Sequence, residues 1–320
     1  MLNFWRKKKH LNTKGNDNYE KKLSRVKSTW DRWQVEYNPD LKLDWWHSPV
    51  IMAHCQELVT GDLALDIYGF IKKEILSETI DRGLSICSGS GDFERGLLDH
   101  KICRHIDAYE ISEERVKEGR RLSKEGNYSI NFITEDINFA IFKKNYYDIF
   151  FSWSALHHVK NLEVVCQNAR AALKKGGLVI AQEFIGPNQF QWTDKQVLII
   201  NKILNILPER YRLNLRTKQL ITAFKRPTIE EMNRTDPSEA IRSEDIIEVL
   251  KQFFNVTMIR YFGGSLFLPL FNGIMGNFDH DDKDAVALIK MILLLEQTLI
   301  DEGVLSHNYA VIIAQNTKGL

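Results

Sequence analysis

The sequence predicts an α/β fold: a doubly wound sheet of seven strands, an N-terminal helical lid, and a helical insertion after the fifth strand. Three observations favour it. Short apolar runs alternate with helical patterns through the middle of the chain, as in parallel β-α units. The first run ends in the tight turn Ser88-Gly89-Ser90-Gly91, and a helical pattern follows at once. The second run ends in an acidic residue, Glu110, which is typical of nucleotide-binding sheets.

The glycine turn is the centre of this interpretation. Gly89 and Gly91 can adopt positive φ and have no Cβ, so a ligand can lie directly against the main chain. An ordinary strand-to-helix turn has the same pattern, and the turn alone does not decide. Glu110 lies 21 positions after Gly89, where an acid can accept both ribose hydroxyl hydrogens. Asp136, after a third run, could accept a hydrogen bond from the exocyclic amine of adenine.

Four further runs complete the expected sheet. Residues 147–152 lead into Trp153-Ser154-Ala155-Leu156-His157-His158, and residues 178–183 follow a Leu-Lys-Lys-Gly-Gly turn. The last two strands are expected at residues 255–261 and 309–314, on either side of a long helix at 284–302.

Taken in order, these pieces resemble the class I S-adenosylmethionine-dependent methyltransferases. The resemblance covers roughly residues 80–186 and the last strand. A nicotinamide-dependent dehydrogenase would carry a third glycine where this chain has Glu94, and that interpretation does not account for the later motifs. The resemblance implies a Rossmann-like methyltransferase sheet with S-adenosylmethionine as the cofactor. It assigns to the cofactor Ser88, Gly89, Ser90, Gly91, Glu110, Ile111, Asp136, Ile137, Ser152 and Trp153.

The catalytic candidates are His157, His158 and Glu183. Methyl transfer from a sulfonium needs alignment and exclusion of water, and a base only where the acceptor is a weak acid such as a sugar hydroxyl. Either histidine could be that base, since imidazole titrates near neutral pH. The alternative is one structural histidine at a helix start and one that faces solvent. Glu183, which ends strand 5, is a comparable candidate for contacting the acceptor, and Asp236 and Glu239 in the insertion rank below it.

No metal site is predicted. The run Asp279-His280-Asp281-Asp282 is interpreted as solvated charge, because successive loop residues rarely converge on one ion. The four cysteines show no zinc spacing and suit a reducing cytosol.

The chain divides into five expected segments: a disordered tail (1–18), a helical lid (19–78), the cofactor-binding core (79–187), a helical insertion that covers the acceptor pocket (188–242), and the end of the core (243–320). Lid helices are expected at 19–37, 49–59 and 62–75, and insertion helices at 194–207 and 217–224. The Trp45-Trp46-His47 segment could pack on a ligand or anchor the N-terminal arm. The apolar stretch 262–278 is expected to form a buried loop and one wall of the pocket, with interfacial contact as the alternative.

Net charge and the missing motifs limit the classes of molecule that this protein is expected to bind. The formal net charge is +1, from 43 basic and 42 acidic residues, so no overall field favours nucleic acid or an anionic membrane. An Asn/Asp-Pro-Pro-aromatic tetrapeptide, expected in nucleic-acid methyltransferases, is absent after strand 4. Residues 1–20 have no apolar core of a signal peptide. We therefore expect a cytoplasmic protein with a small-molecule acceptor and no membrane insertion, and a homodimer stays open.

The function expected from these observations is methyl transfer to a small molecule by in-line displacement. The favoured acceptor atom is a hydroxyl oxygen of a sugar or another biosynthetic metabolite. The alternative is a catalytically silent relative that binds the cofactor or serves as an assembly partner.

Overall fold

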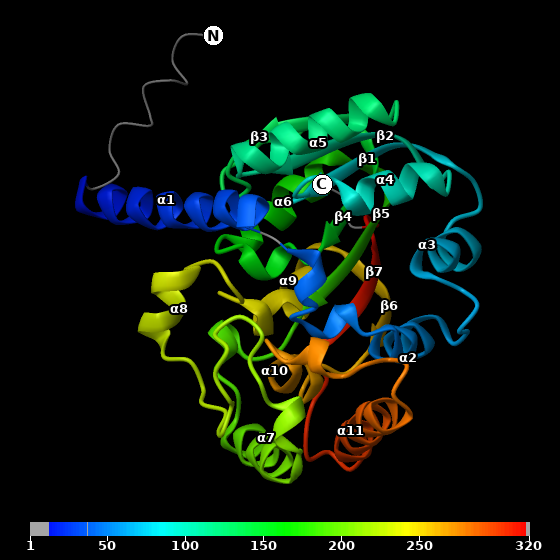
Figure 1. Cartoon of the computed structure of the whole chain (residues 1–320). Helices are drawn as coiled ribbons and strands as arrows, with labels where there is room; N and C mark the ends of the chain where they lie inside the picture. The colour runs from blue at the N-terminus through cyan, green and yellow to red at the C-terminus, as the bar shows by residue number, and fades with distance from the viewer. Residues whose placement is uncertain (1–12, 37, 318–320) are drawn as a thin grey trace.

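The computed structural model describes residues 13–36 and 38–317, and its centre is a seven-stranded sheet (Figure 1). The strand order is β3-β2-β1-β4-β5-β7-β6. All neighbours pair in parallel except β7, which is antiparallel to both β5 and β6. The predicted doubly wound fold is confirmed. The strands are β1 (Ile80–Ile86), β2 (Cys103–Glu110), β3 (Ile130–Thr134), β4 (Tyr147–Trp153), β5 (Leu173–Phe184), β6 (Asn255–Tyr261) and β7 (Tyr309–Gln315).

The central strands are apolar because helices cover the sheet on both faces. Phe150 and Phe151 of β4 point to opposite faces, and both are fully buried. One face packs against α6 (Leu162–Ala172) and α9 (Ile246–Phe253). The other packs against α2 (Pro49–Thr60), α4 (Asp92–Asp99), α5 (Glu113–Glu125) and α11 (Lys283–Asp301). The chain order reverses between β1 and β4, and the carboxyl edge at that reversal is where such sheets bind ligands.

The N-terminal segment begins as a helix earlier than expected. Helix α1 (Thr13–Glu36) starts at Thr13, so the end of the segment expected to be a disordered tail is helical. The rest of that tail, residues 1–12, lies outside the described residues. Helix α1 contacts α5 on one side and α8 (Ile229–Thr235) on the other (Figure 1).

The third lid helix is shorter than expected. It begins at Ile67, as α3 (Ile67–Phe70) followed by a π turn η4 (Ile71–Ile75). The Asp66 side chain fixes that start, because it accepts the N–H of Gly69. Among the described residues, no helix is both long enough and apolar enough to span a membrane.

The insertion after β5 is only partly helical. It contains α7 (Asp194–Ile206), the 3-10 turn η7 (Glu209–Tyr211) and α8. The helix expected at 217–224 is wrong, because Leu213 and Leu220 form an antiparallel bridge there. The Asn214 side chain accepts the N–H groups of Arg216 and Thr217, which closes a turn in place of a helix. Other short 3-10 helices are η2 (Pro39–Leu41), η3 (Trp45–His47), η5 (Leu156–His158), η6 (Asn188–Phe190), η8 (Ser243–Asp245) and η9 (Met275–Asn277).

The apolar stretch 262–278 is buried and includes the short helix α10 (Phe267–Phe271). Trp45 packs on it, with its ring centroid 5.0 Å from that of Phe267 and 5.5 Å from that of Tyr309. Trp45 therefore anchors the N-terminal arm in the core, whereas Trp46 is 46% exposed. Residues 262–278 pack the core and contribute no wall to the cavity at the carboxyl edge of the sheet.

Candidate cofactor and acceptor site

A cavity opens at the carboxyl edge of the sheet, between the strand ends and α1. Its volume is about 1010 Å³ when the open mouth is included. Four residues assigned to the cofactor lie in its wall: Glu110, Ile111, Asp136 and Ile137. The wall contains none of the turn residues that were assigned with them, Ser88, Gly89, Ser90 and Gly91. The opposite wall comes from α1, and one end is formed by Ser154, His158, Pro237, Ser238 and Ile241.

The glycine turn has the backbone that the sequence predicts. Gly89 has φ +58° and Gly91 has φ +83°, and residues with a side chain rarely adopt this backbone conformation. A Cβ added at Gly89 would lie 2.9 Å from the Arg115 guanidinium. The turn is therefore closely covered by the Arg115 side chain of α5, which would have to shift to make room for a side chain at position 89.

Glu110 holds this turn in place. Its carboxylate is buried and accepts backbone N–H groups from Gly89 at 2.8 Å, Ile111 at 2.8 Å and Ser112 at 2.9 Å. The bond from Gly89 joins the ends of two strands, so Glu110 also positions the glycine turn. The sequence pattern did not reveal this role. A carboxylate offers about four lone-pair positions, so one is left for a ribose hydroxyl.

Helix α1 contacts the residues expected to bind adenine. The Tyr19 hydroxyl donates a hydrogen bond to Asp136, which also accepts the backbone N–H of Asn138 at 3.0 Å. The Arg115 guanidinium lies 4.9 Å from the ring centroid of Trp30 and 4.8 Å from that of Trp33. These contacts hold α1 over the cavity, with Tyr19 at the acceptor atom that the sequence assigns to the adenine amine.

The end of β4 differs from the expectation. Ser152 is fully buried and donates its hydroxyl hydrogen to Glu183 at 2.5 Å. Trp153 stacks on Phe93 with ring centroids 4.1 Å apart. Neither lies in the cavity wall; Ser154 does. Alternate strand residues point to opposite faces of the sheet, and the positive φ of Ser154 (52°) then turns the chain toward the cavity.

Glu183 does not reach the cavity. It is 0% exposed, and it accepts the backbone N–H groups of Ala155 at 3.0 Å and Leu156 at 2.9 Å. It also contacts Nδ1 of His157 at 2.8 Å. Because its oxygens are occupied and buried, Glu183 orients His157 and the loop after β4, and direct contact with an acceptor, as the sequence suggested, is not available to it.

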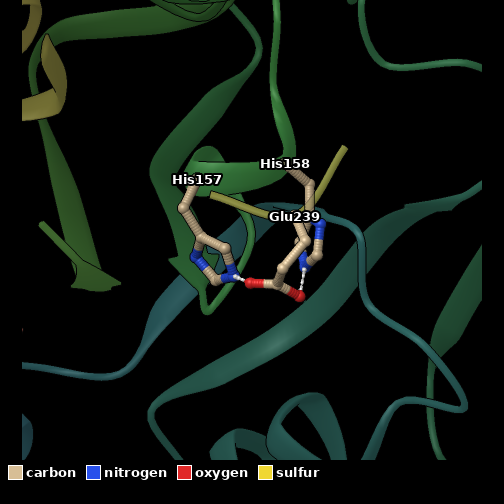
Figure 2. Close-up of side chains that lie close together, drawn as sticks. All are labelled: His157, His158 and Glu239. Atoms are coloured by element: carbon tan, nitrogen blue, oxygen red, sulfur yellow. Dashed lines mark ion pairs between the residues drawn. The ribbon is translucent and has the colours of Figure 1, made fainter. Parts of the chain in front are cut away.

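His157 and His158 both face Glu239, and we call these three residues the histidine cluster (Figure 2). The Nε2 atom of His157 lies 3.8 Å from one carboxylate oxygen of Glu239, and Nε2 of His158 lies 3.9 Å from the other. Glu239 comes from the insertion, and sequence reasoning ranked it low because no spacing relates it to residues 81 and 82 positions earlier.

Burial sets the electrostatics of the cluster. It lowers the pKa of His158, and the neighbouring His157 lowers it further. Burial also raises the pKa of Glu239. His158 is thus a neutral imidazole at pH 7, able to accept a proton or donate its lone pair.

Residues 84–181 match the model of a methyltransferase domain family. Comparison with curated proteins gives no significant match. The fold is similar to that of an S-adenosylmethionine-dependent methyltransferase from Mesorhizobium loti (14% identity, 75% of this chain and 93% of that chain covered, TM-score 0.45). It is also similar to that of geranyl diphosphate C-methyltransferase from Streptomyces coelicolor (11% identity, 76% and 72% covered, TM-score 0.45).

The site fits the cofactor of that family, S-adenosylmethionine. Acidic side chains stand in the cavity wall at the end of β2 and after β3, and the turn after β1 has two glycines at positive φ. The matched domain spans β1 to β5, the strands that carry these features. Residues 84–181 therefore match a methyltransferase domain family, and the features of the site fit the class I S-adenosylmethionine-dependent type.

Proposed function

We propose that this chain methylates a hydroxyl oxygen of a small-molecule acceptor by in-line displacement. When bound, S-adenosylmethionine supplies an activated methyl group, because its sulfur carries a positive charge and leaves as a neutral thioether. The observation that carries the proposal is the histidine cluster, whose His158 lies in the cavity wall beside Ser154.

A hydroxyl acceptor explains why such a cluster would be there. A neutral amine attacks a sulfonium without losing a proton first, whereas a hydroxyl must shed its proton during transfer. Buried imidazoles and carboxylates destabilise a fold unless they are paired, so an unused group of this kind would be a liability. The cluster offers nitrogens and a carboxylate that can take the proton, or hold an ion that weakens the O–H bond.

The other residues then have binding and positioning roles. Glu110 accepts from one ribose hydroxyl while it holds Gly89, and Asp136 accepts from the adenine amine in place of Tyr19. Glu183 is a positioning residue, because it acts through His157. The near-zero net charge of the chain supports a small acceptor in preference to nucleic acid.

The lid and the insertion would close over the acceptor together. In the structure they are already joined, since Thr29 of α1 donates its hydroxyl hydrogen to the Thr235 carbonyl at 2.8 Å. Exclusion of water keeps the acceptor aligned with the methyl group. Hydrogen exchange should show added protection in α1 and in residues 229–241 when S-adenosylhomocysteine and acceptor bind. Protection of the Gly89 turn alone would contradict joint closure.

The test of the function has two parts. S-adenosylmethionine and S-adenosylhomocysteine should raise the melting temperature, and nicotinamide dinucleotides should not. Formation of S-adenosylhomocysteine should then be measured with a panel of hydroxylated metabolites and a matched panel of amines. We expect turnover with hydroxyl acceptors, and we expect it to fall at least a hundredfold in His157→Ala while cofactor affinity is unchanged. Turnover with amines that is indifferent to His157→Ala would refute the hydroxyl assignment.

A second candidate function is a catalytically silent cofactor-binding or assembly protein. The contact that favours it is the hydrogen bond from Tyr19 to Asp136, which occupies the position assigned to adenine. This candidate predicts cofactor binding without turnover of any acceptor in either panel.

A further inference from the structure

The histidine cluster has the geometry of a metal site. The ligand atoms of His157, His158 and Glu239 all lie within 4.8 Å of one another, and it is the only such group of three among the residues the structure describes. Figure 2 shows both Nε2 atoms directed at the Glu239 carboxylate. The sequence predicted no metal, because ligands 81 positions apart leave no spacing motif.

We infer that Nε2 of His157, Nε2 of His158 and the Glu239 carboxylate bind one divalent transition-metal ion of the zinc class. Its open position would receive the acceptor oxygen, and this role rests on the proposed function. Two imidazoles and one carboxylate form a ligand set found in catalytic zinc sites, and they favour transition metals over Mg²⁺ or Ca²⁺.

The distances leave a place for an ion. Separations of 3.8 and 3.9 Å are too long for hydrogen bonds. Ligands at 2.0–2.2 Å from a tetrahedral ion are about 3.4 Å apart. The three candidate ligand atoms lie within 4.8 Å of one another, so they have to approach by at most about 1.4 Å to hold one ion. The Glu239 carboxylate receives no hydrogen bond from any residue within 13–36 or 38–317, so nothing has to be broken first.

The surroundings of the two histidines support the same assignment. Metal-binding histidines usually donate the other ring N–H to a carboxylate, carbonyl or water. Nδ1 of His157 is 2.8 Å from Glu183, and Nδ1 of His158 is 3.1 Å from the Ser238 hydroxyl. That hydroxyl donates its own hydrogen to Asp236 at 2.6 Å, so it accepts the imidazole N–H. Both rings are thereby held with the Nε2 lone pair facing the cluster.

Charge is a separate observation that points to a cation. Three buried or half-buried carboxylates, Glu183, Glu239 and Asp236, surround the two imidazoles. Within the described residues, their ion pairs are with His157 and His158 alone. Asp236 is 7% exposed, and its Oδ2 atom has no hydrogen-bond partner there. Buried uncompensated charge destabilises a fold, and a divalent ion would offset it.

The ion would act on the acceptor as a Lewis acid. Coordination lowers the pKa of a bound hydroxyl and fixes the direction of its oxygen. The O–H bond breaks toward the uncoordinated oxygen of Glu239, which takes the proton. The acceptor oxygen forms its bond to the methyl carbon as the carbon–sulfur bond breaks, and the electron pair stays on sulfur. The Glu239 side chain is 24% exposed, so solvent can remove the proton afterwards.

Calorimetry with Zn²⁺ tests the site without any cofactor or acceptor. The full chain is treated with a chelator, freed of it, and titrated with ZnCl₂. We expect one ion per chain in the wild type and at least tenfold weaker binding in Glu239→Gln. Glu230→Gln is the matched control, an exposed acid of the same insertion, and should bind as the wild type does. His158→Gln is a second ligand variant and should also bind at least tenfold more weakly.

Three further measurements decide the interpretation. Each variant should bind S-adenosylhomocysteine like the wild type, which shows that it is folded. Co²⁺ in place of Zn²⁺ should give a visible absorption band that Glu239→Gln removes. Absence of saturable Zn²⁺ binding, or equal binding by Glu239→Gln and Glu230→Gln, would overturn the metal site even if methyl transfer is found. Zn²⁺ binding without any S-adenosylhomocysteine binding would support the metal site and overturn the proposed function.

Discussion

The two halves of the cavity treat their carboxylates differently. In the cofactor half, Glu110 accepts three backbone hydrogen bonds at 2.8–2.9 Å. In the acceptor half, Glu239 lies 3.8 and 3.9 Å from two imidazole nitrogens and receives no hydrogen bond from a described residue. The protein itself supplies hydrogen-bond donors to the carboxylate of Glu110, whereas the carboxylate oxygens of Glu239 receive none from the described residues.

This difference has a physical cause and a consequence. The cofactor half is built from consecutive β-α units, so backbone N–H groups at strand ends are close to the acid that follows the next strand. The acceptor half joins η5 to a distant insertion by one backbone hydrogen bond, from the Ile241 N–H to the His157 carbonyl at 3.0 Å, and otherwise by side chains. The contrast agrees with our proposal that the cofactor half is preorganised and that a bound ion completes the acceptor half.

The largest expected effect comes from a substitution in the glycine turn of the cofactor half. Gly89→Val should weaken S-adenosylhomocysteine binding more than a hundredfold, because φ is +58° and the new side chain would meet Arg115 at 2.9 Å. Calorimetry measures the loss. Gly303→Val is the control, with φ +68° and open space around its Cβ, so it carries the backbone strain without the clash. Equal affinity in both variants would place the cofactor elsewhere.

Glu110→Gln should have the next largest effect. The amide replaces one acceptor oxygen with a donor that faces a backbone N–H, and it removes the charge that attracts the ribose hydroxyls. Hydrogen bonds to charged groups contribute about 1.5–3 kcal/mol, so the dissociation constant should rise roughly 10- to 150-fold. Glu135→Gln is the matched control, an exposed acid in the same cavity wall. If the two variants bind alike, Glu110 has no ribose contact.

Glu94 is the exception within the cofactor half, and its effect should be smaller. Burial raises the pKa of Glu94 to about 7, although Ser85 donates a hydrogen bond to it at 2.5 Å. Above the ordinary value near 4.5 the unfolded carboxyl is ionised, while the folded one keeps its proton to about pH 7. The free energy of unfolding should therefore fall as pH rises from about 4.5 to about 7, and be level above.

Glu94→Gln should remove that part of the slope. Its melting temperature should exceed the wild-type value by a few degrees at pH 8 and by less at pH 5. The exposed Glu113→Gln is the control and should keep the wild-type pH dependence. A difference between Glu94→Gln and wild type that shrinks as pH rises would contradict the sign. Glu296, which also has a raised pKa of about 7, keeps a residual slope in every variant.

The smallest effect concerns the lid. Tyr19→Phe removes the hydroxyl that donates to Asp136, so the adenine amine no longer competes with it. A single net hydrogen bond contributes about 0.5–1.5 kcal/mol, and affinity for S-adenosylhomocysteine should rise about two- to tenfold. Tyr128→Phe, which loses a bond to Asp99 far from the cavity, should leave affinity unchanged. Weaker binding in Tyr19→Phe would mean that Tyr19 contacts the cofactor directly.

The sequence by itself determined the seven strands, the glycine turn, and the places of Glu110 and Asp136 at the cavity. It could do so because each depends on spacing within one or two β-α units, where a strand end and the next turn are local neighbours. The helix expected at 217–224 was wrong. The hydrogen bonds that the Asn214 side chain accepts stabilise a turn there, and this local effect outweighs the helix propensity of the segment.

Only the tertiary structure decided the acceptor half. Pairing of β4 with β5 buries Glu183 against Ser152 and His157, and this takes it away from the acceptor. A single positive φ puts Ser154, in place of Ser152, in the cavity wall. The return of the insertion brings Glu239 to His157 and His158. Such contacts join residues with no common period or spacing, and packing of the whole chain, which no local pattern encodes, brings them together.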